Sequence, residues 1–243
     1  MAALIEVRNL RFRYPDGTEA LAGVDFRLEE GETVALFGPN GSGKTTFVLH
    51  LVGLLQGEGE VRVCGLPVEK EHLKTIRSRA GIVFQDADVQ LFMPTVLEDV
   101  AFGPLNLGLP EAEAKRRAER ALEQVNMAGA IHKAPYHLSA GEKRRVALAG
   151  VLAMEPEILI LDEPTTFLDP PGRRVLLSLL QELPQAKLLV THDAEFALAL
   201  ARRAVFFDKG RIVREGSVAE VVREQGWTAA AKLEPLSGAQ SGA

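Results

Sequence analysis

The stretch that decides the fold is Gly38-Pro39-Asn40-Gly41-Ser42-Gly43-Lys44-Thr45-Thr46, which lies between two apolar runs. The run before it, 33–37, is predicted to be a buried strand, and the run after it, 47–55, a helix with a wide apolar face. A strand, a glycine-rich turn and a helix form the setting that the phosphate-loop pattern G-x-x-x-x-G-K-[S/T] requires. The sequence therefore predicts a site for a nucleoside triphosphate; a glycine-rich turn that binds nothing is the less favoured alternative.

The chemistry of the loop follows from its residue types. Its glycines let the backbone wrap closely enough for successive N–H groups to point at phosphate oxygens, and the helix that follows adds the positive end of its dipole. We expect Lys44 to reach the β- and γ-phosphates and the Thr45 hydroxyl to ligate Mg²⁺. Thr46 is expected to close the site on the side of the β- or α-phosphate.

The composition sets limits on the function. With 243 residues, 47% of them apolar and 25% charged, the chain is long enough for one sizeable soluble domain. A net charge of −5 argues against a sequence-independent nucleic-acid surface. No apolar run approaches the ~20 residues of a membrane helix. We therefore expect no nucleic-acid partner and no direct insertion into a membrane, and the single cysteine favours a reducing compartment.

The hydrophobic pattern predicts an α/β fold with a helical insertion. Strands are expected at 4–14, 20–28, 60–65 and 81–84, with a short helix at 69–77. From about 86 to 154 the pattern is helical throughout, with helices at 95–107, 110–125 and 139–152. Strands then return at 158–161, 187–191, 204–207 and 211–213, and helices are expected at 171–183, 193–201 and 217–225. The small and polar residues 229–243 are predicted to form a flexible tail.

Two acids follow the apolar strand predicted at 158–161. If this strand runs parallel to the phosphate-loop strand, Asp162 lies near the Mg²⁺ and contacts it through water. Glu163, one residue later, is then placed to orient and polarise the attacking water as a general base. A solvated acidic turn at the end of a strand is the alternative interpretation.

Upstream of these acids, the segment Leu138-Ser139-Ala140-Gly141-Glu142-Lys143-Arg144-Arg145 resembles the signature sequence of ATP-binding-cassette (ABC) ATPases. The resemblance covers nearly the whole chain. It implies a single domain over 1–228: a P-loop NTPase core with an antiparallel β subdomain and an all-helical subdomain inserted at about 86–154. The usual signature is Leu-Ser-Gly-Gly-Gln, and Ala140 and Glu142 depart from it. We expect neither change to disable the site.

The resemblance also implies roles for single residues. Tyr14 resembles the aromatic residue that stacks on adenine, and Gln85 the glutamine that senses the metal and links to the partner. His192 resembles the histidine that contacts the γ-phosphate. Each of these residues alone has a simpler interpretation as a packing or surface residue. The implied cofactors are ATP and Mg²⁺, the implied catalytic set is Glu163, His192 and Gln85, and the implied metal site is Thr45, Gln85 and Asp162.

A second cassette subunit is implied as well, in an ATP-dependent homo- or heterodimer. The residues that would act on the partner's nucleotide are Ser139, Ala140, Gly141, Glu142 and Asp169. Because the signature lies in the insertion, it is expected on the far side of the domain from its own phosphate loop.

A narrower resemblance concerns 84–108, which is similar to the ATPases of energy-coupling-factor transporters, including the cobalt and nickel importers. In that group the segment forms part of the groove that receives a helix of the membrane scaffold, and here Leu91, Phe92 and Met93 are expected to offer an apolar surface. This implies an ATPase that powers import of a metal ion or vitamin. It would be held at the cytoplasmic face of the membrane by transmembrane partners that contact 85–108. The alternatives are an apolar core of the insertion, or a soluble ABC ATPase such as those of iron–sulfur cluster assembly.

Overall fold

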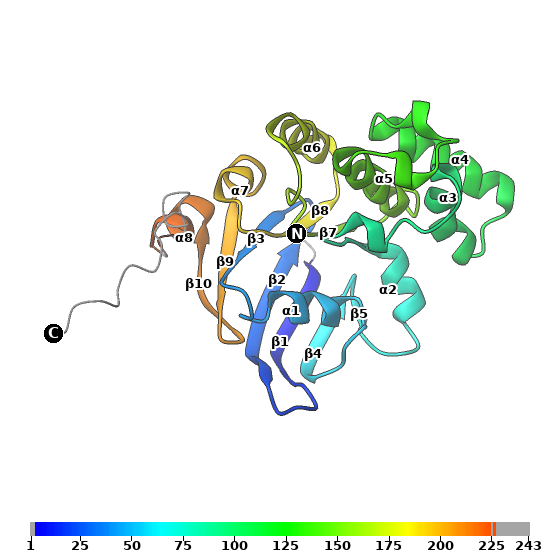
Figure 1. The fold of residues 1–243 in the computed structure, drawn as a ribbon. Coiled ribbons are helices and arrows are strands. Elements are labelled where there is room, and N and C mark those ends of the chain that lie inside the picture. Colours follow the sequence, from blue (N-terminus) through cyan, green and yellow to red (C-terminus); the bar gives the residue numbers. More distant parts are fainter. Residues whose placement is uncertain (1–2, 225, 227–243) are drawn as a thin grey trace.

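The computed structural model describes residues 3–224 and 226, which form two sheets and the helices that cover them (Figure 1). In the smaller sheet the strand order is β2-β1-β4-β5, and all pairs are antiparallel. Its strands are β1 (Ala3–Arg13), β2 (Glu19–Glu29), β4 (Glu58–Val63) and β5 (Leu66–Pro67). This sheet is the antiparallel β subdomain that the resemblance implied.

The larger sheet has the order β10-β9-β3-β8-β7-β6. All neighbouring strands in it are parallel except β10, which returns antiparallel to β9. The carboxyl ends of the parallel strands therefore meet at one edge, where ligands of open α/β sheets bind. The strands are β3 (Thr33–Phe37), β6 (Ala80–Val83), β7 (Ile158–Asp162), β8 (Ala186–Val190), β9 (Arg203–Asp208) and β10 (Arg211–Ser217).

Side chains of the central strand β3 alternate between two cores, as the period of two in a strand requires. Val34 and Leu36 pack in the core shared with the antiparallel sheet and α1 (Lys44–Leu51). Ala35 and Phe37 pack on the opposite face, in the core that includes the helical insertion. The sheet is buried on both faces, which explains the continuous apolar run before the phosphate loop.

The insertion is helical, as predicted, and no strand lies between residues 86 and 154. Figure 1 shows its three α-helices gathered at one side of the molecule. One short 3₁₀ turn precedes them at Ala87–Val89, and two lie between the second and third helices at Ala128–Ala130 and Pro135–His137. The α-helices are α3 (Val96–Asn106), α4 (Glu111–Gln124) and α5 (Ala140–Leu152).

The other helices are α2 (Leu73–Arg79), α6 (Pro170–Glu182), α7 (Ala194–Leu200) and α8 (Val218–Glu224). Among residues 3–224, no helix is long and apolar enough to cross a membrane. Ser217 caps α8, as predicted, because its hydroxyl oxygen accepts from Glu220 N at 3.3 Å. Gln225, the predicted domain end at 228 and the predicted tail 229–243 lie outside the described residues.

Two of the predicted helices are wrong by four residues at one end. The helix after the phosphate loop ends at Leu51 rather than at residue 55, because Gly53 turns the chain at φ 66° against the side chain of Leu73. The helix predicted at 69–77 begins only at Leu73, since a turn in which His72 N donates to Glu69 O at 2.9 Å precedes it. In the first case the apolar run continues past the end of the helix, and in the second a turn precedes its start.

Candidate active site

The phosphate loop connects β3 to the amino end of α1. Gly38 has φ 145° and Gly43 has φ 107°, a region that side chains rarely adopt. A Cβ atom at Gly38 would also collide with the carbonyl oxygen of Phe207, and one at Gly43 with the carbonyl oxygen of Ala20. These two glycines let the loop pass close to its neighbours and direct the N–H groups of the first turn of α1 outward.

Lys44 is buried to 7% exposure and lies back across the loop. Its ammonium donates to the carbonyl oxygens of Gly38 at 2.7 Å and Pro39 at 2.9 Å. Burial lowers the pKa of Lys44, while the nearby carboxylates of Glu163 and Asp162 raise it. A buried cation thus faces the space above the loop, where an anion can replace the carbonyl contacts.

Four predicted site residues follow the carboxyl ends of neighbouring strands in the larger sheet. Gln85 follows β6, Asp162 and Glu163 end β7, and His192 follows β8. The Nε2 atom of His192 lies 3.2 Å from Oε1 of Glu163, and the backbone N–H of His192 donates to Oε2 of Glu163 at 3.3 Å. The parallel order of the strands brings residues far apart in sequence to one edge, as the sequence predicted for Asp162.

The two acids at the end of β7 have different surroundings. Asp162 is 8% exposed; burial raises its pKa, and the cations of Lys44 and Arg144 lower it. Glu163 has φ 45°, a left-handed conformation that costs about 1–3 kcal/mol for a residue other than glycine. Its backbone N–H donates to Val190 O at 2.8 Å, which holds this conformation against β8. Strain of this kind is typical of residues whose side chains must point in one direction.

These residues share one cavity of about 340 Å³ with Tyr14. The Tyr14 hydroxyl lies 3.0 Å from Oγ1 of Thr46, and its ring meets Phe12 edge to face at 4.9 Å. Thr18, Glu19 and Ala20 also line the cavity, and the sequence did not predict them there because no residue type among them marks the contact. The lining residues are Tyr14, Thr18, Glu19, Ala20, Asn40, Gly41, Gly43, Lys44, Thr45, Thr46, Gln85, Asp162, Glu163, Val190 and His192.

Three of the predicted loop residues do not line this cavity. Gly38 and Pro39 lie beneath it and accept hydrogen bonds from Lys44. Ser42 is buried to 3% exposure, and its carbonyl oxygen accepts from Gly210 N at 2.9 Å. These residues shape the loop, whereas Asn40, Gly41 and the residues from Gly43 to Thr46 line the cavity.

Ser139 begins the signature helix α5 with a capping box. Its backbone N–H and its hydroxyl both donate to Oε2 of Glu142 at 2.8 Å, and Glu142 N donates back to the Ser139 hydroxyl oxygen at 3.4 Å. These bonds lower the pKa of Glu142. The sequence contains the signal for this box, a serine followed three residues later by a glutamate, in addition to the departure from the usual signature noted above.

The signature does not reach the phosphate loop of its own chain. It lines a separate hollow of about 300 Å³ that shares no residue with the first cavity. Asp169 lies in the same hollow and caps α6, accepting from Gly172 N at 2.8 Å. The residues of this hollow are Ser139, Ala140, Gly141, Glu142, Arg145, Phe167, Leu168, Asp169, Gly172 and Val175.

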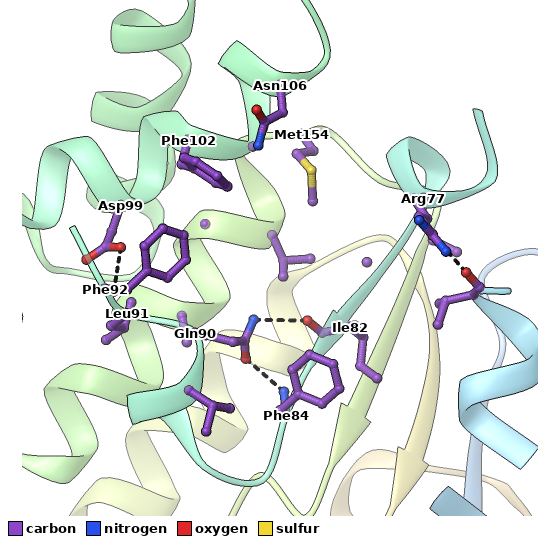
Figure 2. A pocket seen from close by; sticks show the side chains of 18 of the residues that line it. Arg77, Ile82, Phe84, Gln90, Leu91, Phe92, Asp99, Phe102, Asn106 and Met154 are labelled. Atoms are coloured by element: carbon purple, nitrogen blue, oxygen red, sulfur yellow. Dashed lines mark hydrogen bonds between the residues drawn. The ribbon is translucent and has the colours of Figure 1, made fainter. Parts of the chain in front are cut away.

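A third hollow, an apolar groove of about 680 Å³, lies between α2, β6, α3 and α5 (Figure 2). Phe92 is 61% exposed there and meets Phe102 edge to face at 5.0 Å. The buried carboxylate of Asp99 accepts from Phe92 N at 3.0 Å and from Met93 N at 2.9 Å, which fixes this wall. Leu91 and Phe92 line the groove as predicted, whereas Met93 does not.

The ABC transporter family model matches residues 21–166 of the chain. The chain is 49% identical to the energy-coupling factor transporter ATP-binding protein EcfA of Methanothermobacter thermautotrophicus, over 91% of this chain and 73% of that protein. It superposes with a TM-score of 0.83 and 37% identity on cbiO1 of Clostridium perfringens, described as part of the ABC transporter complex cbiONQ, over 93% and 92% of the two chains. It also superposes on the dimeric structure of the ATP-binding cassette MJ0796 bound to ADP and Pi, with a TM-score of 0.79 and 29% identity, over 88% of this chain and 98% of that chain.

Proposed function

The chain belongs to the ABC transporter family, and we propose that it is the ATP-hydrolysing subunit of an energy-coupling-factor type importer of a metal ion or vitamin. As a member of this family it binds ATP and hydrolyses it. One observation carries the proposal: a single cavity combines the phosphate loop and Lys44 with Asp162, Glu163 and His192. This set provides both the binding and the cleavage of a triphosphate.

In this proposal the nucleotide lies along the wall from Tyr14 to Lys44. The Tyr14 ring, which Phe12 and the Thr46 hydroxyl hold in place, stacks on adenine. Lys44 leaves the carbonyl oxygens of the loop for the β- and γ-phosphates. The N–H groups at the start of α1 hold the remaining phosphate oxygens.

For hydrolysis, Glu163 is the general base. Its carboxylate takes a proton from the water that attacks the γ-phosphorus, and the bond between that phosphorus and the β,γ-bridging oxygen breaks. His192 lies within hydrogen-bond distance of Glu163, so it keeps the carboxylate directed at the water while its ring faces the γ-phosphate. Gln85 faces the same cavity from the neighbouring strand β6.

The donors around the cavity fit a Mg²⁺ ion. A hydroxyl from Thr45, an amide oxygen from Gln85 and a carboxylate from Asp162 line it together. No group of three His, Cys, Asp or Glu side chains in the described part of the chain could hold a metal by itself. Thr45 and Gln85 would hold the ion together with phosphate oxygens of the nucleotide, and Asp162 would contact it through water. When bound, Mg²⁺ neutralises charge on the phosphates as it develops.

A second cassette subunit completes the site. The hollow with Ser139, Gly141 and Asp169 is separate from the chain's own cavity. In a head-to-tail pair it faces the γ-phosphate held by the partner, with the N–H groups of the first turn of α5 directed at it. The MJ0796 cassette, similar to this chain, is dimeric.

The apolar groove is the docking site for a helix of a transmembrane scaffold. Exposed Phe92 and Phe102 offer apolar anchors, and the groove borders the segment 85–108. In this proposal the chain lies at the cytoplasmic face of the membrane and is held there by such partners. The groove and the named relatives favour an importer over a soluble ABC ATPase of iron–sulfur cluster assembly.

Co-purification tests the transporter assignment. The full chain is co-expressed with candidate transmembrane scaffold proteins from neighbouring genes, where such genes are found, and Phe92→Asp is compared with wild type. We expect the variant to lose the membrane partner and to keep ATP affinity, because Phe92 does not line the nucleotide cavity. Leu198→Asp, at a 50% exposed leucine on α7, is the matched control and should retain the partner. Equal recovery with Phe92→Asp would contradict the docking assignment.

A further inference from the structure

Arg144 is a buried cation on the signature helix. It lies on α5 one turn beyond the Ser139–Glu142 capping box and is 3% exposed. Its guanidinium donates to two successive carbonyl oxygens, those of Phe84 and Gln85. Burial lowers the pKa of Arg144, and the carboxylates of Asp86 and Asp162 raise it. The forked guanidinium therefore lies where α5, the end of β7 and the segment after β6 meet.

The residues 84–90, here the glutamine segment, form a closed unit. The Gln90 side chain accepts from Phe84 N at 2.8 Å and donates to Ile82 O at 3.2 Å, so it joins the two ends of the segment (Figure 2). Asp88 N donates to Asp86 Oδ1 at 2.9 Å within it. A hydrogen-bonded network of this kind makes the segment rigid.

A second contact ties the same unit to α5. Lys143, the residue before Arg144, pairs with Asp88 at 2.6 Å. In sequence the run from Glu142 to Arg145 is typical of a solvated helix face, but the exposures differ: the Lys143 side chain is 19% exposed and Arg144 is buried. Two successive cations of α5 therefore face the glutamine segment rather than solvent.

We propose that Arg144 is a positioning residue that joins the glutamine segment to the signature helix, so that Gln85 and Ser139 move as one body. The inference rests on the proposed function, because Gln85 faces the chain's own nucleotide and Ser139 the partner's. Phe84 and Gln90 also line the apolar groove. A partner helix seated there thus acts on both nucleotide sites through a single rigid unit.

Amide hydrogen exchange of the full chain without nucleotide tests the connection. Arg144→Lys keeps the charge but cannot hold two carbonyl oxygens in a fork. We expect exchange to accelerate together in 84–90 and in the first two turns of α5 by about tenfold, the scale of one lost charge-assisted hydrogen bond. Asp88→Asn, at an exposed position, should accelerate the same two segments by a smaller factor.

A matched control uses another guanidinium with several acceptors. Arg203 donates to Glu32, Glu215 and the carbonyl oxygen of Arg27. Arg203→Lys should accelerate exchange around those residues and leave 84–90 unchanged. If Arg144→Lys destabilises the whole chain, exchange also rises in α6. The test then rests on Asp88→Asn, which should accelerate exchange in 84–90 and at the start of α5 but not in α6. Faster exchange in 84–90 alone, or in neither segment, would overturn the proposal.

The functional consequence is measured separately. With Arg144→Lys, ATP affinity in the absence of Mg²⁺ should stay at the wild-type value, since the phosphate loop is untouched. The Mg²⁺ concentration for half-maximal hydrolysis should rise several-fold, because Gln85 is no longer held in place. An unchanged Mg²⁺ requirement would contradict this consequence. A wild-type chain without hydrolysis would contradict the proposed function instead, and the exchange result would still stand.

Discussion

Replacing Glu163 by Gln changes the chemistry of the site and little of its shape. The side chain is 14% exposed, with Oε1 at 3.2 Å from His192 Nε2 and Oε2 accepting from His192 N. Glutamine has the same size, and its amide oxygen can accept the same backbone hydrogen bond. It cannot take a proton from water. The substitution therefore isolates the proposed role of Glu163 as a general base.

The structure sets the size of the effect. Loss of a general base lowers turnover by about 10²–10⁴, which corresponds to about 3–5 kcal/mol in the barrier. Nucleotide affinity should stay equal or become tighter, because the negative charge of Glu163, which acts on Lys44, no longer opposes the phosphates. Lys44→Ala should show the opposite pattern, since it removes the cation that binds the anion.

Single-turnover hydrolysis and equilibrium titration with ATP measure the two quantities separately. Glu195→Gln, at an exposed acid on α7, is the matched control and should keep wild-type values in both assays. A Glu163→Gln chain that hydrolyses ATP near the wild-type rate would refute the assignment of the base. Weaker ATP binding with normal hydrolysis would instead make Glu163 a binding residue.

Three further outcomes are expected. Tyr14→Ala should weaken ATP binding by about 1–2 kcal/mol, the scale of stacking on an aromatic ring, and Tyr14→Trp by less; titration checks both. Ser139→Arg should abolish ATP-dependent dimerisation and turnover but leave ATP binding to the monomer, as light scattering and titration will show. Lys187 is 4% exposed, and burial lowers its pKa from 10.5 to about 8. The unfolded chain then binds the extra proton between pH 8 and 10.5, so the free energy of unfolding rises with pH there by about 3 kcal/mol. Lys187→Met should remove this rise, and the difference between the two denaturation series isolates it from the titration of Cys64, whose pKa burial raises to about 11.

The parts of the fold that the sequence predicted are those with a local signal. The apolar runs before Gly38 and Asp162 lie in strands buried on both faces, and the change to a helical pattern after residue 86 marks the insertion. The site residues could be placed because parallel strands end at one edge, so that order along the chain becomes proximity in space.

The parts that were missed depend on contacts between distant segments. Gly53 ends α1 because Leu73 packs against it, and nothing near Gly53 in the sequence indicates that neighbour. Arg144 resembles its charged neighbours in sequence, and only its burial beneath Phe84 and Gln85 distinguishes it. Charge alone does not predict exposure when a guanidinium can satisfy carbonyl oxygens inside the protein.

The unusual signature illustrates why a departure from a family pattern needs a structure. A glutamate at position 142 would place a negative charge beside the partner's γ-phosphate if its side chain pointed outward. The carboxylate instead turns back onto the N–H and hydroxyl of Ser139. The N–H groups of Ala140 and Gly141 belong to the first turn of α5, where a helix offers no acceptor of its own. The positive end of the helix dipole and these donors therefore remain directed outward, so Glu142 stabilises the start of α5 and leaves the donors open for the phosphate contact that we propose.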